Sequence, residues 1–115
     1  MRVTAVIPGR PVAKQRARTV NGHTYTPPKT RAYEELVAIC AATASGSFAE
    51  GRLSVSVMLC STTQLRGDLD NYAKSVLDGI VKGGLIGDDR QIRRLLIEEQ
   101  PGAIEDVVYV TVEAL

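Results

Sequence analysis

The sequence predicts an α+β fold in which a small mixed β-sheet of about four strands packs with two α-helices, in the order β-α-β-α-β-β. Several segments alternate apolar and polar residues, which is typical of half-buried strands. Two other segments repeat apolar residues every three or four positions, which is typical of amphipathic helices. The order of these segments favours a mixed sheet with the helices packed on one or both faces.

Four segments have the alternation of a strand: residues 2–8, 52–60, 91–99 and 106–115. The last two are expected to form a closing pair, because Pro101 and Gly102 between them are turn residues. A long loop, residues 9–28, follows the first strand. In this loop Asn21-Gly22 is the two-residue sequence of a tight hairpin turn.

Two segments have the spacing of a helix. The first begins near Lys29, and its apolar stripe consists of Tyr33, Leu36, Val37, Cys40, Ala41 and Ala44. The second runs from about Asp70 to Lys82, where Gly83-Gly84 ends it. Its apolar stripe consists of Ala73, Val76, Leu77, Ile80 and Val81.

Length and composition narrow the class of protein. With 115 residues, 44% hydrophobic and 23% charged, the chain is expected to form one domain, residues 1–115, rather than a disordered segment. No apolar run approaches the roughly 20 residues of a membrane span, and the first residues lack a signal-peptide core, so a cytoplasmic protein is expected. The net charge of +1 does not by itself indicate a nucleic-acid partner. Cys40 and Cys60 lack metal-ligand spacing and are expected to be buried free thiols.

The segment RGDLDNYAKSVLDGIVKGGLIGDDRQI, residues 66–92, contains five aspartates: Asp68, Asp70, Asp78, Asp88 and Asp89. Asp70, Lys74 and Asp78 are four residues apart and therefore share one edge of the predicted helix, where Lys74 neighbours Asp70. Carboxylates placed close together raise one another's pKa and cost stability unless a cation compensates. Mg²⁺ is the natural cation, because it takes oxygen ligands and keeps waters available for chemistry.

Capping is the simpler explanation for part of this pattern. Asp68 or Asp70 can cap the helix, and Asp88-Asp89 can be turn residues, but capping accounts for one carboxylate in each turn and not for two. An EF-hand does not fit, because Tyr72 stands where that loop needs an oxygen ligand, and a Walker-type phosphate loop is absent. The single histidine, His23, is expected to be a surface residue.

The acidic segment resembles the core of the RusA family of Holliday junction resolvases. The matching residues are Asp68-Leu69-Asp70-Asn71, Lys74, Asp78-Gly79 and Asp88-Asp89. The upstream segment PVAKQRARTVNGHTYTPPKTRAYEE is similar to the N-terminal segment of the family, so the resemblance covers nearly the whole chain. One departure is Gly67, where some relatives have a second basic residue.

The resemblance implies a RusA-like homodimeric endonuclease that resolves four-way DNA junctions by paired symmetric nicks in recombination and repair. It implies four catalytic residues: Asp68, Asp70, Lys74 and Asp89. It implies Mg²⁺ held by Asp68, Asp70 and Asp89, with Asp88 in support, and it leaves open whether one or two ions bind. The basic residues expected near DNA phosphates are Lys14, Arg16, Arg18, Arg66 and Lys82.

Two other functions remain open. The first is a protein that binds junctions without cutting them, although the intact residues Asp68, Asp70, Lys74 and Asp89 argue against it. The second is a structural domain stabilised by a cation and unrelated to DNA. In that case Mg²⁺ raises the melting temperature and DNA does not.

Overall fold

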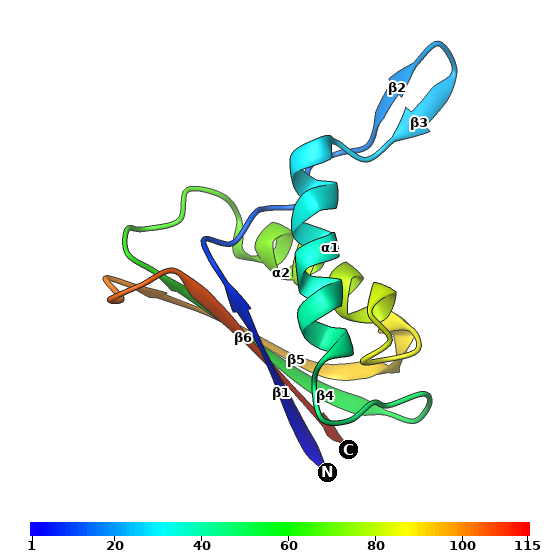
Figure 1. The fold of residues 1–115 in the computed structure, drawn as a ribbon, viewed down its shortest axis with the longest axis vertical. Helices are drawn as coiled ribbons and strands as arrows, with labels where there is room; N and C mark the ends of the chain where they lie inside the picture. The colour runs from blue at the N-terminus through cyan, green and yellow to red at the C-terminus, as the bar shows by residue number, and fades with distance from the viewer.

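The computed structural model describes residues 1–115, apart from the side chain of Arg18, and confirms the predicted α+β fold (Figure 1). The strands and helices are β1 (Arg2–Pro8), β2 (Arg18–Val20), β3 (His23–Tyr25), α1 (Pro28–Ala42), β4 (Leu53–Ser61), α2 (Leu69–Lys82), the 3₁₀ helix η1 (Asp89–Gln91), β5 (Ile92–Pro101) and β6 (Val107–Ala114).

Four strands form a mixed sheet in the order β1-β6-β4-β5. Strand β6 pairs antiparallel with both β1 and β4, whereas β5 pairs parallel with β4. The prediction that the last two strands pair with each other is therefore wrong, because β4 lies between them. Two physical causes explain this order. Helix α2 makes a crossover from β4 to β5, which yields parallel neighbours. Strand β6 buries Val108, Val110 and Val112 completely, which suits an interior position better than β5 with its charged residues.

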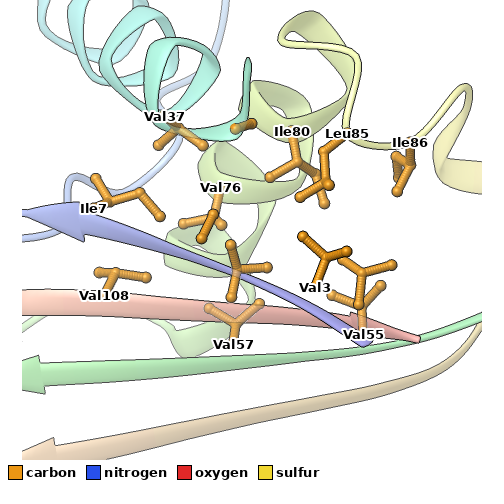
Figure 2. Packing of buried hydrophobic residues seen from close by; sticks show 14 of the residues in the cluster. Val3, Ile7, Val37, Val55, Val57, Val76, Ile80, Leu85, Ile86 and Val108 are labelled. Carbon is orange, nitrogen blue, oxygen red and sulfur yellow. The ribbon is translucent and has the colours of Figure 1, made fainter. Parts of the chain in front are cut away.

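Both helices pack on the same face of the sheet, and the core lies between the two layers (Figure 2). The core includes Val55 and Val57 from β4, Val37 from α1, and Val76 and Ile80 from α2. The predicted helical stripes agree with the packing, since every residue assigned to them is buried or half-buried. Burying one such side chain stabilises the fold by roughly 1.5–3 kcal/mol, so this layer fixes where α2 lies on the sheet.

Two glycines allow α2 to approach α1 closely. A Cβ atom on Gly79 would lie 2.5 Å from the side chain of Val37, and one on Gly83 would lie 2.3 Å from the carbonyl oxygen of Ala38. A larger residue at either position would push the helices apart. The contact between α1 and α2 therefore depends on these two small residues.

The loop after β1 contains the predicted hairpin. Strands β2 and β3 pair antiparallel around Asn21 and Gly22, whose φ angles of 52° and 79° are those of a type I′ turn. The hairpin projects away from the sheet and helices (Figure 1).

Two further observations concern the cysteines and the length of the helices. Cys40 and Cys60 are free thiols, the first half-buried and the second buried. Within the described residues, neither helix combines the length and the apolar character that crossing a membrane requires.

Candidate active site on helix α2

The turn that leads into α2 is held by residues at the ends of the sheet strands. Glu99 of β5 accepts a hydrogen bond from the backbone N–H of Leu65 at 2.8 Å. Asp106, just before β6, accepts one from the N–H of Thr62 at 2.7 Å. Arg10 donates to two carbonyl groups of the same loop and lies 3.6 Å from Asp106. The first aspartates are therefore presented by an anchored loop and a packed helix.

Asp68 stands at the N-cap position of α2, yet its carboxylate makes no capping hydrogen bond. Its backbone carbonyl instead accepts from the N–H of Tyr72 at 3.3 Å. Asp70 follows in the first turn, and both aspartates are exposed. Capping therefore does not explain the Asp68 carboxylate. Both carboxylates are free to bind a cation or another ligand from solution.

The second acidic pair, Asp88 and Asp89, differs from the first because one of its carboxylates makes capping hydrogen bonds. Asp88 caps η1, because its Oδ1 accepts from the N–H of Arg90 at 2.8 Å while the Gln91 side chain accepts from the N–H of Asp88 at 2.9 Å. The hydrogen bonds from the backbone and then the side chain of Arg90 hold the pKa of Asp88 below its ordinary value. Asp89 is exposed. The capping explanation is therefore right for Asp88, and Asp89 is the freer carboxylate of this pair.

The two acidic pairs do not meet. Asp88 and Asp89 line a hollow of about 190 Å³ together with Asp78 and Val81 of α2. Along the helix, Asp78 lies about 12 Å from Asp70 at 1.5 Å per residue. Among the residues that the structure describes, no three Asp, Glu, His or Cys side chains are close enough to hold one metal ion. The predicted ligands thus form two separate pairs in one chain and no single cage.

Lys74 lies one turn after Asp70 on the exposed side of α2. It lines a hollow of about 240 Å³ together with Asn71 and the segment 14–17, which includes Arg16. Lys74 and Asp70, which the sequence predicts to be neighbours, form no ion pair, since none of the ion pairs among the described side chains includes Lys74. Exposed pairs of this kind gain little. Its ammonium group is therefore available to a ligand in the hollow.

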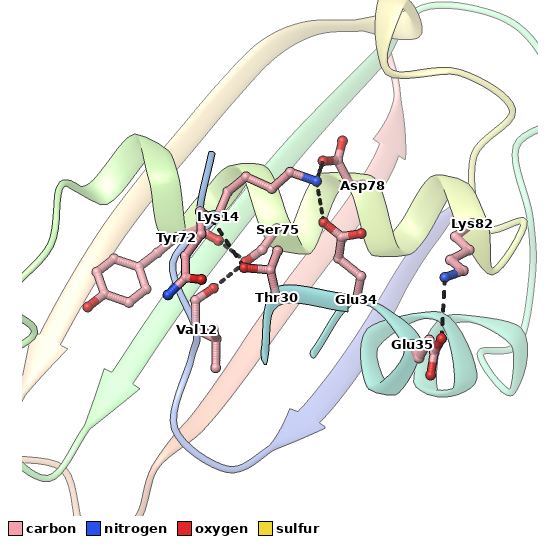
Figure 3. A network of polar contacts seen from close by, with 10 residues as sticks. Val12, Lys14, Thr30, Glu34, Glu35, Tyr72, Ser75, Asp78 and Lys82 are labelled. Atoms are coloured by element: carbon pink, nitrogen blue, oxygen red, sulfur yellow. Dashed lines mark hydrogen bonds and ion pairs between the residues drawn. The ribbon is translucent and has the colours of Figure 1, made fainter. Parts of the chain in front are cut away.

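Lys14 has a structural role that the sequence did not indicate. Its Nζ lies 2.5 Å from Oε2 of Glu34 on α1 and 3.0 Å from Oδ2 of Asp78 on α2 (Figure 3). Burial lowers the pKa of Lys14, but the hydrogen bonds and charges of Glu34 and Asp78 outweigh burial and raise the pKa above 10.5. The ammonium predicted to contact phosphate is already engaged by two carboxylates.

Glu34 is the residue of this network that sequence reasoning missed. It is only 9% exposed although it is charged, and a charged residue is rarely buried without a partner. The sequence does indicate that Glu34 is buried, because it lies between Tyr33 and Val37, two buried residues of the apolar stripe. This position predicts that Glu34 has a buried partner, but it does not identify Lys14 as that partner.

Backbone contacts attach the same segment to both helices. The N–H of Lys14 donates to the carbonyl of Asn71 at 2.8 Å, and the Ser75 hydroxyl donates to the carbonyl of Val12 at 2.6 Å. The N–H of Gln15 donates to Oγ1 of Thr30 on α1 at 3.2 Å. Arg16 comes directly after this attachment, which is why it lies beside Lys74.

The remaining predicted phosphate contacts are spread along the molecule. Arg66 is exposed just before Asp68. Lys82 lies at the other end of α2, 3.8 Å from Glu35, and both of these side chains are about half exposed. The side chain of Arg18 lies outside the described part of the chain. Gly67 donates its N–H to the Tyr72 hydroxyl at 3.3 Å.

One comparison with known proteins identifies the family of the chain. The family model described as Endodeoxyribonuclease RusA matches residues 8–113, which is nearly the whole chain. Comparison with curated proteins gives no match. The match includes α2, η1 and the segment that contacts them. The chain therefore belongs to the RusA endodeoxyribonuclease family of Holliday junction resolvases.

Proposed function

We propose that this protein is a Mg²⁺-dependent, structure-selective endodeoxyribonuclease that resolves Holliday junctions by paired symmetric nicks during DNA recombination and repair. The single observation that carries the proposal is the exposed side of α2. Two carboxylates without capping bonds, Asp68 and Asp70, lie six and four residues before a lysine that is free of ion pairs among the described side chains. That lysine, Lys74, shares a hollow with Arg16. This combination suits the hydrolysis of a phosphodiester.

The donor chemistry fits Mg²⁺ even though the ligands form two pairs. Mg²⁺ is usually bound by one or two carboxylates together with waters and substrate phosphates, so a closed protein cage is not required. Asp68 and Asp70 would hold the ion. Asp89, with Asp88 in support, stands in the separate pair and would be a further ligand only if the two pairs approach each other when DNA and the ion bind. When bound, the ion supplies a nucleophilic water at neutral pH and stabilises charge on the phosphate.

The chain's own residues supply the rest of the site. Lys74 donates to a non-bridging oxygen of the scissile phosphate and stabilises the charge that develops there. Arg16, in the same hollow, binds a neighbouring phosphate and holds the strand in place. The loop anchored by Glu99 and the packing of α2 keep these groups in a fixed relation.

Symmetric cleavage requires two such sites. A four-way junction has near two-fold symmetry, and a C₂ homodimer presents two identical sites in the matching orientation. We therefore propose that the active protein is a homodimer with branched DNA as its substrate. Phosphate-dominated binding of this kind weakens steeply as salt increases.

The test compares wild type and Asp70→Asn on a labelled immobile four-way junction and on a linear duplex of the same sequence, each with Mg²⁺ and with EDTA. Glu105→Gln, which neutralises an exposed carboxylate outside the site, is the matched control. Paired nicks on the junction alone, dependent on Mg²⁺ and Asp70 and retained by Glu105→Gln, are expected. Binding without nicks in any divalent metal would indicate a junction-binding protein. A melting temperature raised by Mg²⁺ but not by DNA would indicate a structural domain.

A further inference from the structure

Strand β5 is an edge strand with apolar residues exposed on both faces. It pairs with β4 on one side only. Leu95 and Leu96 are 44% and 57% exposed, and consecutive residues of a strand point to opposite faces of the sheet. A long exposed edge of this kind is a ready template for pairing with another strand.

The order of residues in β5 is self-complementary. Two basic residues, three apolar residues and two acidic residues follow one another: Arg93, Arg94, Leu95, Leu96, Ile97, Glu98 and Glu99. If a second β5 runs antiparallel beside the first with Leu96 opposite its own copy, Arg94 lies opposite Glu98 and Leu95 lies opposite Ile97. Directly opposite residues share a face in antiparallel strands, so these pairs would be in contact.

Symmetry leaves few other registers. A two-fold axis perpendicular to the sheet places one residue of β5 opposite its own copy. Centring the pair on Leu95 sets Arg94 opposite Leu96, and centring it on Ile97 sets Leu96 opposite Glu98. Both of these registers place a charge against a leucine, whereas the register centred on Leu96 pairs opposite charges and apolar residues together.

We propose that β5 pairs antiparallel with β5 of a second copy of this chain around Leu96, which joins two four-stranded sheets into one of eight strands. The proposal rests on the proposed function, because it assigns the interface of the homodimer. A two-fold axis perpendicular to the sheet does not exchange the two faces of the sheet. The helices of both copies therefore lie on the same side of the eight-stranded sheet. Both acidic sites then face the same side of the dimer, as two nicks in one junction require.

Charge reversal provides the main test, with association measured by sedimentation equilibrium in the absence of DNA. Arg94 and Glu98 are exposed and, among the described side chains, take part in no ion pair. Arg94→Glu or Glu98→Arg alone places like charges opposite each other at two positions, which should weaken the dimer by about tenfold or more. The double variant restores both pairs and should restore the dimer. Glu105→Arg, outside β5, is the control and should leave the association constant unchanged.

Disulfide trapping tests the register itself. Opposite residues in antiparallel strands have Cα atoms about 4.5–5.5 Å apart, within the range of a disulfide. Leu96→Cys should therefore form a covalent dimer under mild oxidation. Wild type, which retains its own two cysteines, and Ile104→Cys, at a fully exposed position, should not.

The outcomes separate this interface from the proposed function. A dimer that neither single charge reversal weakens, or that the double variant fails to restore, would overturn the β5 interface and leave the homodimer in place. Equal trapping of Leu96→Cys and Ile104→Cys would overturn the register. A wild-type protein that is monomeric at all concentrations would overturn both the interface and the homodimer, while junction nicking by that monomer would still support the nuclease.

Discussion

Replacing Lys14 with methionine tests the network that joins the N-terminal segment to both helices. The substitution keeps a long side chain but removes the ammonium that lies between Glu34 and Asp78. Glu34 is 9% exposed, so its carboxylate would lose its partner in a place that water scarcely reaches. We expect a substantial loss of stability with no change of fold.

The size of the expected stability loss follows from the distances between the charges and from their burial. At an effective dielectric constant of about 20, charges 2.5 and 3.0 Å apart attract by roughly 6 kcal/mol each. Most of this gain is offset by desolvation, and breaking a fully buried pair costs about 3–5 kcal/mol. The side chains of Lys14 and Asp78 are 23% and 33% exposed, so solvent screens part of the interaction. We therefore expect the free energy of unfolding to fall by about 2 kcal/mol.

Urea unfolding measures this change, with the m-value as a check that the denatured state is unaltered. Lys29→Met, at an exposed position on α1, is the matched control and should change the free energy of unfolding by less than about 0.5 kcal/mol. A Lys14→Met variant as stable as the control would refute the inference that the network supports the fold. Lys14 would then be available for the phosphate contact that the sequence predicts.

The pH dependence gives an independent check with a defined sign. The folded pKa of Lys14 lies above its unfolded value of 10.5, so its contribution is complete below pH 10.5 and is lost as pH rises through the folded pKa. Burial also raises the pKa of Tyr33, which removes stability in the same direction. The difference between wild type and Lys14→Met isolates the lysine. That difference should shrink at alkaline pH, and a constant difference would contradict the assignment.

Three further predictions concern packing, catalysis and binding. Gly79→Ala should lower the free energy of unfolding by about 1–3 kcal/mol in urea titrations, because the new methyl group would overlap Val37. Lys74→Met should reduce junction nicking by about a hundredfold or more. The melting temperature should not change, since the side chain of Lys74 is exposed, and an unfolded variant would show instead that Lys74 is structural. Arg16→Ala should reduce the slope of log binding constant against log salt by about 1, and an unchanged slope would exclude a phosphate contact.

The elements were predictable from local spacing, whereas the order of strands in the sheet was not. Helix α2 was expected from about residue 70 to 82 and extends over Leu69–Lys82, because its apolar stripe and the glycines after it both act locally. Alternation identified β5 and β6 as strands but gave no information on their neighbours. The composition of the two strands contained that information, since the valine-rich β6 takes the interior position and the charged β5 takes the edge.

The same limit applies to the aspartates of the site. Asp68 and Asp88 look alike in the sequence, since each precedes a helical turn and is followed by a second aspartate within two residues. Only Asp88 caps, because Gln91 completes a reciprocal box with it. Asp68 has the backbone conformation of a cap without the hydrogen bond. Capping is decided by side-chain geometry, which a motif cannot show.

The cation that pairs with Asp78 is Lys14, from the loop after β1, and not the helical lysine Lys74 that the spacing predicts. A lysine four residues from an aspartate on an exposed helix stabilises by only about 0.3–0.5 kcal/mol. Lys14 instead reaches Asp78 from a distant loop and gains a second carboxylate, Glu34, in a half-buried position where the attraction is less screened. Because the loop lysine neutralises Asp78, the lysine on the helix is not needed there. Lys74 and Asp70 are therefore both left exposed, as the proposed contacts with a phosphate and a metal ion require.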